Sequence, residues 1–271
     1  LDVFYKTSKP LSSQGGSYEL ITPGAAVRFG VPFTELDTVF FGAGVEQTEI
    51  EQGANLPQAY VDYANAFGAS SNTLPLTLGW TRDSRDSALV PSRGRLQRVN
   101  GEMSLTGDAR YYKINYQFQQ YVPLTRQYTL AFNTELGIGK GLNGRPYPVF
   151  KNFFGGGLGS VRGFEQSTFG PVDIEGAFVG GSKRINLNSE FYVPFPGAGN
   201  DRTLRVFTFV DVGNVYGEDQ KVTFSDMRAS AGVGLSWISP LGPLRLAFAQ
   251  PVRKFAGDKI QKLQFQIGTS F

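Results

Sequence analysis

Few side chains in this sequence are suited to covalent chemistry. Cysteine and histidine are both absent, so a thiol nucleophile, a Cys/His zinc site and a Ser-His-Asp triad cannot be built. The acids Glu135, Glu190 and Asp211 could be imagined as a carboxylate pair for acid–base work, but the sequence indicates no pocket and no partner base. Structural ion pairing is the favoured role for these acids. We expect no enzymatic activity, no cofactor and no metal site.

The segment 155–171, GGGLGSVRGFEQSTFGP, places Arg162 in a glycine-rich stretch. Glycine-rich loops can hold phosphate, but only where a helix follows with its N-terminus facing the anion. This segment lacks the lysine of a P-loop and has no helical pattern after it. A flexible linker is also a poor interpretation, because the wider loop 140–177 carries many apolar side chains. Long loops of this kind are usually ordered against a surface.

Apolar and polar residues alternate with a period of two through most of the chain, which predicts β-strands with one apolar and one wet face. The segment RYYKINYQFQQYV (110–122) shows the pattern clearly. In 56–68 apolar residues recur at a spacing of three to four, which fits either a short surface helix or an irregular loop. We predict about twelve strands, roughly at 2–6, 25–33, 38–50, 72–82, 94–105, 110–122, 127–139, 178–194, 203–216, 226–238, 243–250 and 259–271.

These strands predict an all-β fold, an antiparallel transmembrane β-barrel. Several reach the roughly 10 residues that a tilted strand needs to cross a bilayer. Short connections such as VPLTRQ and SPLGP alternate with long ones such as 51–71 and 140–177; in outer-membrane barrels the short turns are periplasmic and the long loops extracellular. A soluble sandwich or barrel is the alternative, but the polar faces carry Gln, Asn, Ser, Thr and Gly rather than the Lys and Glu of a soluble surface.

Composition and the opening residues limit the possible partners and suggest how much of a longer protein this chain represents. A net charge of only +3 lacks the polybasic footprint of nucleic-acid binding, so no nucleic-acid partner is expected. No apolar run approaches the roughly 18–20 residues of a transmembrane helix, and the opening LDVFYKT has no signal-peptide pattern. That opening is already strand-like and lacks Met, so we expect a fragment of a longer protein.

Arg162 would need acidic partners if its loop packs inside a barrel. The planar guanidinium favours bidentate pairing with carboxylates. Strand alternation directs Glu190 and Asp211 inward. In the strand that carries Asp211 the alternation is imperfect, because Phe207 and Phe209 share the face of the aspartate. We predict an ion cluster of Arg162 with Glu190 and Asp211 that pins the loop in the lumen; the alternative is a solvated arginine.

The motif within GGGLGSVRGF resembles the signature of the outer-membrane assembly and two-partner secretion superfamily, and the match is closest to its barrel-assembly factors. Glu190 in NSEFYVPF, Asp211 in FVDVGNVY and the hairpin SWISPLGPLRLAFAQP follow where the family places them. The aromatic end QFQIGTSF resembles the family's targeting strand, and the resemblance runs through the whole chain in order. The motif residues are Val161, Arg162, Gly163 and Phe164.

The resemblance implies a barrel of about 16 strands preceded by periplasmic POTRA domains. Residues 1–271 would then be the C-terminal portion of the barrel domain, with the loop 140–177 folded into the lumen and the POTRA domains and first four strands absent. The last strand would be a targeting strand and one side of a lateral seam. The residues expected to form it are Leu263, Phe265, Ile267, Gly268 and Phe271.

The resemblance also implies a function. It predicts the folding and insertion of outer-membrane β-barrel proteins by edge-strand templating at the seam. The expected partners are nascent outer-membrane proteins, the lipid bilayer and assembly-machinery lipoproteins, the last mainly through the absent POTRA domains. The alternative is a two-partner secretion transporter, which passes a polypeptide through the barrel. A plain diffusion porin fits poorly, because a pore would keep its lumen wet.

Overall fold

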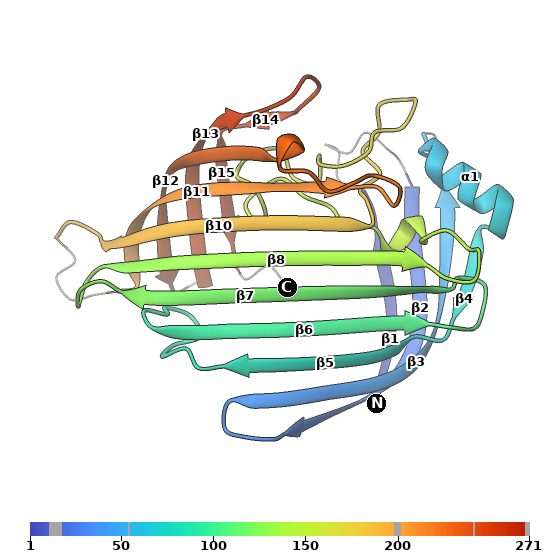
Figure 1. Ribbon diagram of the computed structural model, residues 1–271, viewed down its shortest axis with the longest axis horizontal. Coiled ribbons are helices and arrows are strands. Elements are labelled where there is room, and N and C mark those ends of the chain that lie inside the picture. The colour runs from blue at the N-terminus through green and yellow to red at the C-terminus, as the bar shows by residue number, and fades with distance from the viewer. Residues whose placement is uncertain (11–17, 54, 198–201, 241, 269–271) are drawn as a thin grey trace.

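A computed structural model describes residues 1–10, 18–53, 55–197, 202–240 and 242–268. The chain forms one large antiparallel sheet with the order β1-β2-β3-β5-β6-β7-β8-β10-β11-β12-β13-β15 (Figure 1). The strands are β1 (Asp2–Ser8), β2 (Tyr18–Pro32), β3 (Asp37–Gln52), β5 (Leu76–Asp83), β6 (Gly94–Ser104), β7 (Tyr111–Pro123), β8 (Thr129–Gly141), β10 (Lys183–Pro194), β11 (Leu204–Tyr216), β12 (Arg228–Ser239), β13 (Gly242–Arg253) and β15 (Leu263–Ile267).

Smaller elements complete the fold. β4 (Ser70–Thr73) pairs with β3, and β9 (Gly163–Phe164) pairs with β14 (Ile260–Gln261) in a separate two-stranded sheet. The helices are α1 (Gln58–Phe67) and the 3-10 turns η2 (Val149–Lys151) and η3 (Phe224–Asp226). None of the helices in the described ranges is long and apolar enough to cross a membrane. Because α1 lies within 56–68, the prediction of a short helix there is confirmed and the alternative of an irregular loop is wrong.

The main sheet follows the predicted strands in order, so the all-β prediction is confirmed, but four boundaries were wrong. The strand predicted at 25–33 begins at Tyr18, because residues 18–21 already pair with β3. The segment 72–82 is broken between β4 and β5 by Leu74 and Pro75, because proline cannot donate to the ladder. Residues 178–182 are not in β10 but bridge the long loop through Phe178 and Gly181. The segment 259–271 divides at Lys262 into β14 and β15, since its first residues pair with the loop.

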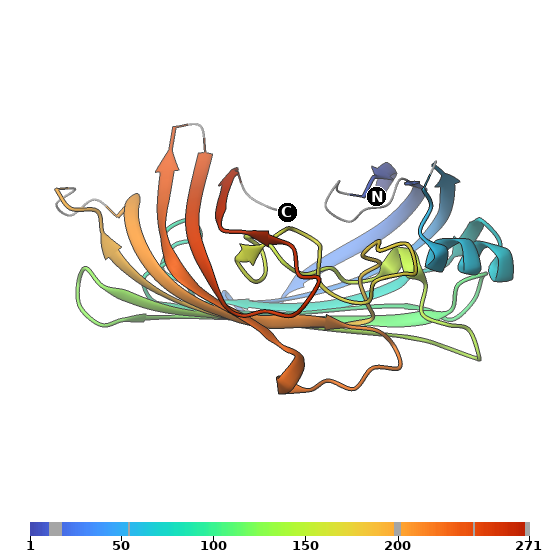
Figure 2. The same ribbon diagram turned by 90° about the horizontal axis from the view of Figure 1, so that it is seen from above.

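The sheet curves into a trough whose two end strands are β1 and β15 (Figure 2). Within the described residues no backbone pairing joins these two strands, so the sheet is not closed. The arginine loop (residues 142–182, between β8 and β10) lies on the concave side. The fold thus presents a convex face, an interior filled by one loop, and two strand edges.

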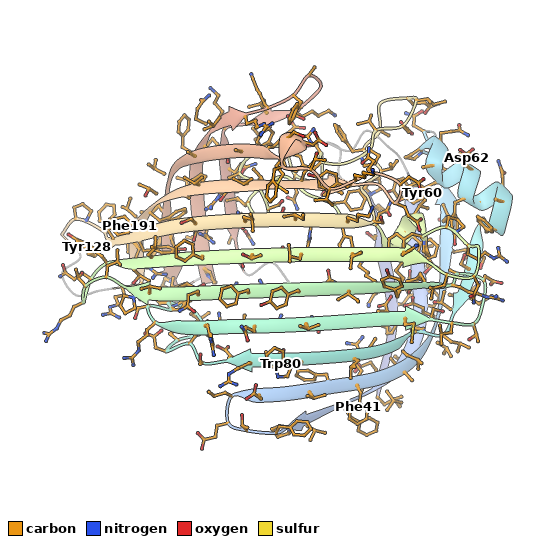
Figure 3. The ribbon with its side chains drawn as sticks, viewed as in Figure 1. Phe41, Tyr60, Asp62, Trp80, Tyr128 and Phe191 are labelled. Atoms are coloured by element: carbon orange, nitrogen blue, oxygen red, sulfur yellow. The ribbon has the colours of Figure 1, made fainter. Side chains whose placement is uncertain are left out.

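The convex face of the sheet is apolar. Phe29 and Phe41 stack there with ring centroids 5.4 Å apart, and both are about half exposed. Tyr128 and Phe191 lie next to each other at the short-turn end of the sheet (Figure 3). Extended exposed apolar surface is unfavourable in water. An outward apolar band with a polar interior is the arrangement of a barrel whose surroundings are lipid.

α1 packs over the other end of the sheet, together with the arginine loop (Figure 1). Its inward side carries Tyr60 and Tyr63, which join Tyr18 and Ile50 in a buried cluster. Burial raises the pKa of the Tyr60 hydroxyl well above its usual value, so this phenol stays neutral and accepts a 2.9 Å hydrogen bond from Tyr18. Gly68, with φ +94°, ends the helix in a conformation that glycine adopts without strain.

Candidate functional site at the arginine loop

Arg162 lies at the centre of a buried ion cluster. Its Nε and Nη2 donate to the two carboxylate oxygens of Asp211 at 2.6 Å each, and its backbone N–H donates to Oδ2 at 3.0 Å. Its Nη1 donates to Glu190 Oε1 at 2.5 Å. Arg162 is 2% exposed and Asp211 is fully buried. A buried arginine held bidentately by one carboxylate and bonded to a second has fixed geometry.

Glu190 receives further donors from the strands around it. Arg245 Nη2 donates to Glu190 Oε1 at 2.7 Å, and the Tyr192 hydroxyl donates to Oε2. Asn188 adds a 2.9 Å bond to Asp211 Oδ1. Glu190 lies on β10, Asp211 lies on β11, and the second arginine, Arg245, lies on β13. The cluster ties the loop to several strands of the sheet.

The guanidinium of Arg162 also rests on two aromatic rings. Its Cζ lies 3.7 Å from the ring centroid of Phe209 and 5.5 Å from that of Phe207, distances at which a cation is attracted to the ring face. The impure alternation of β11 is thereby explained, since both rings point inward beneath the arginine. Opposite them, β12 carries Gly232 and Gly234, whose missing side chains make room for the rings.

Gly234→Ala is expected to disturb this support. The added Cβ would lie 2.4 Å from Phe207 Cζ and 2.5 Å from the Leu246 carbonyl oxygen, so the ring must shift. Overpacking of this kind costs about 1–3 kcal/mol, which chemical denaturation would measure. Gly101→Ala on β6 is the control, because its nearest neighbour would be 3.6 Å away. Equal stability of the two variants would contradict the packing argument.

The other motif residues are buried beside Arg162. Val161 and Phe164 are fully buried and pack with Phe169 and Val215, and Ile260 covers the cluster. Gly163 has φ +89°, and a Cβ there would lie 3.1 Å from that of Ala249 on β13. Glycine is required here by the backbone conformation as well as by the close approach.

A second anchor holds the first half of the loop, and sequence reasoning missed it. Lys151 in η2 forms salt bridges of 2.6 Å with Glu46 on β3 and 2.9 Å with Glu102 on β6. Lys113 Nζ donates to the Lys151 carbonyl at 2.8 Å, and Tyr111 donates to Glu102 at 2.5 Å. The sequence offered no clear signal for this anchor, because Glu102 already faces Lys113 across the strand pair β6–β7.

The remaining predicted residues lie elsewhere. Glu135 pairs with Arg184 at 3.3 Å and, among the described residues, forms no hydrogen bond or salt bridge with the Arg162 cluster. On β15 the predicted outward residues Leu263, Phe265 and Ile267 are 58%, 73% and 66% exposed. Gly268 has φ +87° and donates its N–H to the Pro243 carbonyl at 2.8 Å. Phe271 falls outside the described residues.

A family model for the Omp85 superfamily domain matches residues 1–271. The chain belongs to the Omp85 superfamily. The match extends over the whole chain, as the resemblance of the arginine motif indicated. The fold, with its long loop on the concave side of an antiparallel sheet, is that of a barrel in this family.

Relatives agree with this assignment. The outer membrane protein assembly factor BamA of Neisseria meningitidis serogroup B is 36% identical over 100% of this chain and 39% of that protein. The human sorting and assembly machinery component 50 homolog is 28% identical over 70% of this chain and 44% of that protein. BamA from Haemophilus ducreyi, crystallised without POTRA domains 1-3, matches with a TM-score of 0.89 and 25% identity, covering 97% of this chain and 57% of that one.

The Omp85 chain described here spans less than two thirds of each of these relatives. CdiB from Acinetobacter baumannii matches with a TM-score of 0.55 at 12% identity, over 92% of this chain and 41% of that one. At that identity the likeness concerns the fold alone. The similarity to BamA therefore extends over sequence and fold, whereas the similarity to CdiB is architectural.

Proposed function

We propose that the intact protein containing this chain folds and inserts β-barrel proteins into the bacterial outer membrane. The observation that carries this proposal is the 36% identity, over the whole chain, to a protein named as an outer membrane protein assembly factor. The apolar convex face supports integration into a bilayer. The buried ion cluster has a structural role, pinning the arginine loop, and no bond of a substrate is made or broken.

In this proposal, incoming barrel strands are paired and inserted at the free edge of β15. This strand pairs with β13 through Leu263 to Ile267, and within the described residues its other edge has no strand partner. Unpaired backbone N–H and C=O groups are costly in lipid, so an arriving strand that pairs with them is stabilised. In this mechanism β15 is one side of a lateral seam and templates the edge of an incoming barrel.

The partners and orientation follow from the same mechanism. Nascent outer-membrane proteins are the substrates, and assembly-machinery lipoproteins bind mainly through POTRA domains of the intact protein. The short turns and the C-terminus lie on the periplasmic side, and α1 and the two ends of the arginine loop, next to β8 and β10, lie on the extracellular side. Phe271, which lies outside the described residues, is proposed to act in targeting together with β15. The mechanism requires no cofactor and no nucleic acid.

Secretion of a polypeptide through the lumen is the competing function. The CdiB-like fold favours it, but the interior is occupied. A cavity of about 460 Å³ beside Glu190 and Arg245 is bounded by Leu158 and Gly159 of the arginine loop. A polypeptide could pass only after the buried Arg162 cluster had been broken. Because the arginine motif is shared by both branches of the superfamily, the choice of assembly over passage rests on the identity to an assembly factor over the whole chain.

Photocrosslinking tests the proposal in the full-length protein reconstituted in liposomes. A benzophenone amino acid at Phe265 on β15 is expected to capture a reporter barrel during its insertion. The same probe at Phe132 on β8, which is also outward and 41% exposed, serves as the matched control because β8 lies in the middle of the sheet. Equal capture at both positions would contradict templating at the edge, and capture of a secreted passenger would support the competing function.

A further inference from the structure

The terminal strand is held on its inward side by the arginine loop as well as by β13. Gln264 is 4% exposed, whereas its neighbours Leu263 and Phe265 point outward. Its Nε2 donates to the Phe164 carbonyl at 2.6 Å, and its Oε1 accepts the Gly163 N–H at 3.3 Å. The side-chain amide thus pairs with the loop backbone as another strand would, with one donor and one acceptor.

The chain just before β15 is fastened to the same part of the loop. β14 pairs with β9 through Ile260 with Phe164 and Gln261 with Gly163. The Glu165 N–H donates to the Lys259 carbonyl at 2.9 Å. The ladder between β15 and β13 covers Leu263–Ile267, and backbone bonds from Ala249 to Lys262 and from Gly268 to Pro243 extend it by one residue at each end. The loop therefore holds the terminal strand and the residues just before it in addition to β13.

The contacts of Gln264 begin at the residue after Arg162. The backbone N–H of Arg162 is bonded to Asp211, and its guanidinium is held by both acids, so the position of Gly163 and Phe164 follows from the ion cluster. We propose that Gln264 is a positioning residue that couples the seating of the arginine loop to the terminal strand. A seated loop holds β15 in register, and an unseated loop releases it for exchange.

Hydrogen exchange of the full-length protein in lipid nanodiscs tests this coupling. Gln264→Met keeps the shape of the side chain but removes both hydrogen bonds, so amide exchange in 263–268 is expected to quicken on the order of tenfold. Gln266→Met is the matched control. Gln266 lies two residues along on the same face, and its Nε2 makes a long 3.5 Å contact with the Gly268 carbonyl rather than a bond to the loop. Gln264→Asn, too short to reach Phe164, is a second variant with the same expected direction.

The ion cluster supplies the second arm of the experiment. Arg162→Lys loses the planar fork and is expected to quicken exchange in 263–268 as well. The double variant Arg162→Lys with Gln264→Met should show little more than the larger single effect, because both act through one connection. Exchange no faster than in Gln266→Met, or additive effects in the double variant, would overturn the coupling.

The importance of the coupling for assembly rests on the proposed function and has its own readout. The rate at which Gln264→Met inserts a reporter barrel is expected to differ from that of wild type and of Gln266→Met. Faster exchange with an unchanged insertion rate would overturn the role of Gln264 in assembly. A wild-type protein that inserts no reporter would instead refute the proposed function, while the exchange result would still decide the coupling.

Discussion

Arg162→Ala is expected to lower the free energy of unfolding by about 3–5 kcal/mol, the cost of leaving a buried ion pair without one partner. Asp211 is fully buried and accepts three hydrogen bonds from this residue, one of which, from the backbone, survives the substitution. Denaturant titration in detergent micelles measures the loss of stability. Limited proteolysis measures whether residues 150–170 of the loop become more accessible to cleavage.

The control for this experiment is Arg126→Ala in the exposed turn between β7 and β8. The side chain of Arg126 is exposed, so its removal is expected to change stability by no more than about 0.5 kcal/mol. Arg162→Lys keeps the charge but not the fork, and its stability should fall between that of wild type and the alanine variant. Protection of 150–170 in Arg162→Ala equal to that in Arg126→Ala would refute the pinning of the loop.

The strands could be predicted because one side of the sheet is apolar. Each strand residue faces either the apolar convex surface or the polar interior, so the alternation of apolar and polar residues predicts the strands directly. The prediction failed where the loop takes over backbone pairing, at 178–182 and at 259–262. Both segments run directly into a true strand, and the contacts of the loop decide which partner their backbone bonds.

The site was partly visible in the sequence for a similar reason. A buried arginine needs acids, and alternation selected two inward ones near it, both of which contact Arg162 in the structure. Gln264 could not be found this way, because an inward glutamine in a polar interior looks the same whether or not it has a specific partner. Lys151 lies in a loop without periodicity, so nothing in its surroundings linked it to strands some 50 to 100 residues away.

Lys151→Glu is the second substitution expected to have a large effect. It would place a third carboxylate beside Glu46 and Glu102, whose side chains are only 10% and 29% exposed. The variant loses both salt bridges and adds like-charge repulsion in a confined interior, so a destabilisation of about 3–5 kcal/mol is expected. Denaturant titration measures this loss, and proteolysis of 142–153 follows the first half of the loop.

Charge exchange separates this electrostatic effect from simple disruption. Adding Glu102→Lys to Lys151→Glu restores an opposite pair at the same position, and much of the lost stability should return. Lys140→Glu is the matched control, because Lys140 is exposed on β8 and makes the same change of charge without entering the interior. Since Arg162 has its own acids, 155–171 should stay protected in Lys151→Glu. A variant as stable as Lys140→Glu, or one that Glu102→Lys does not rescue, would show that Lys151 does not anchor the loop through its charge.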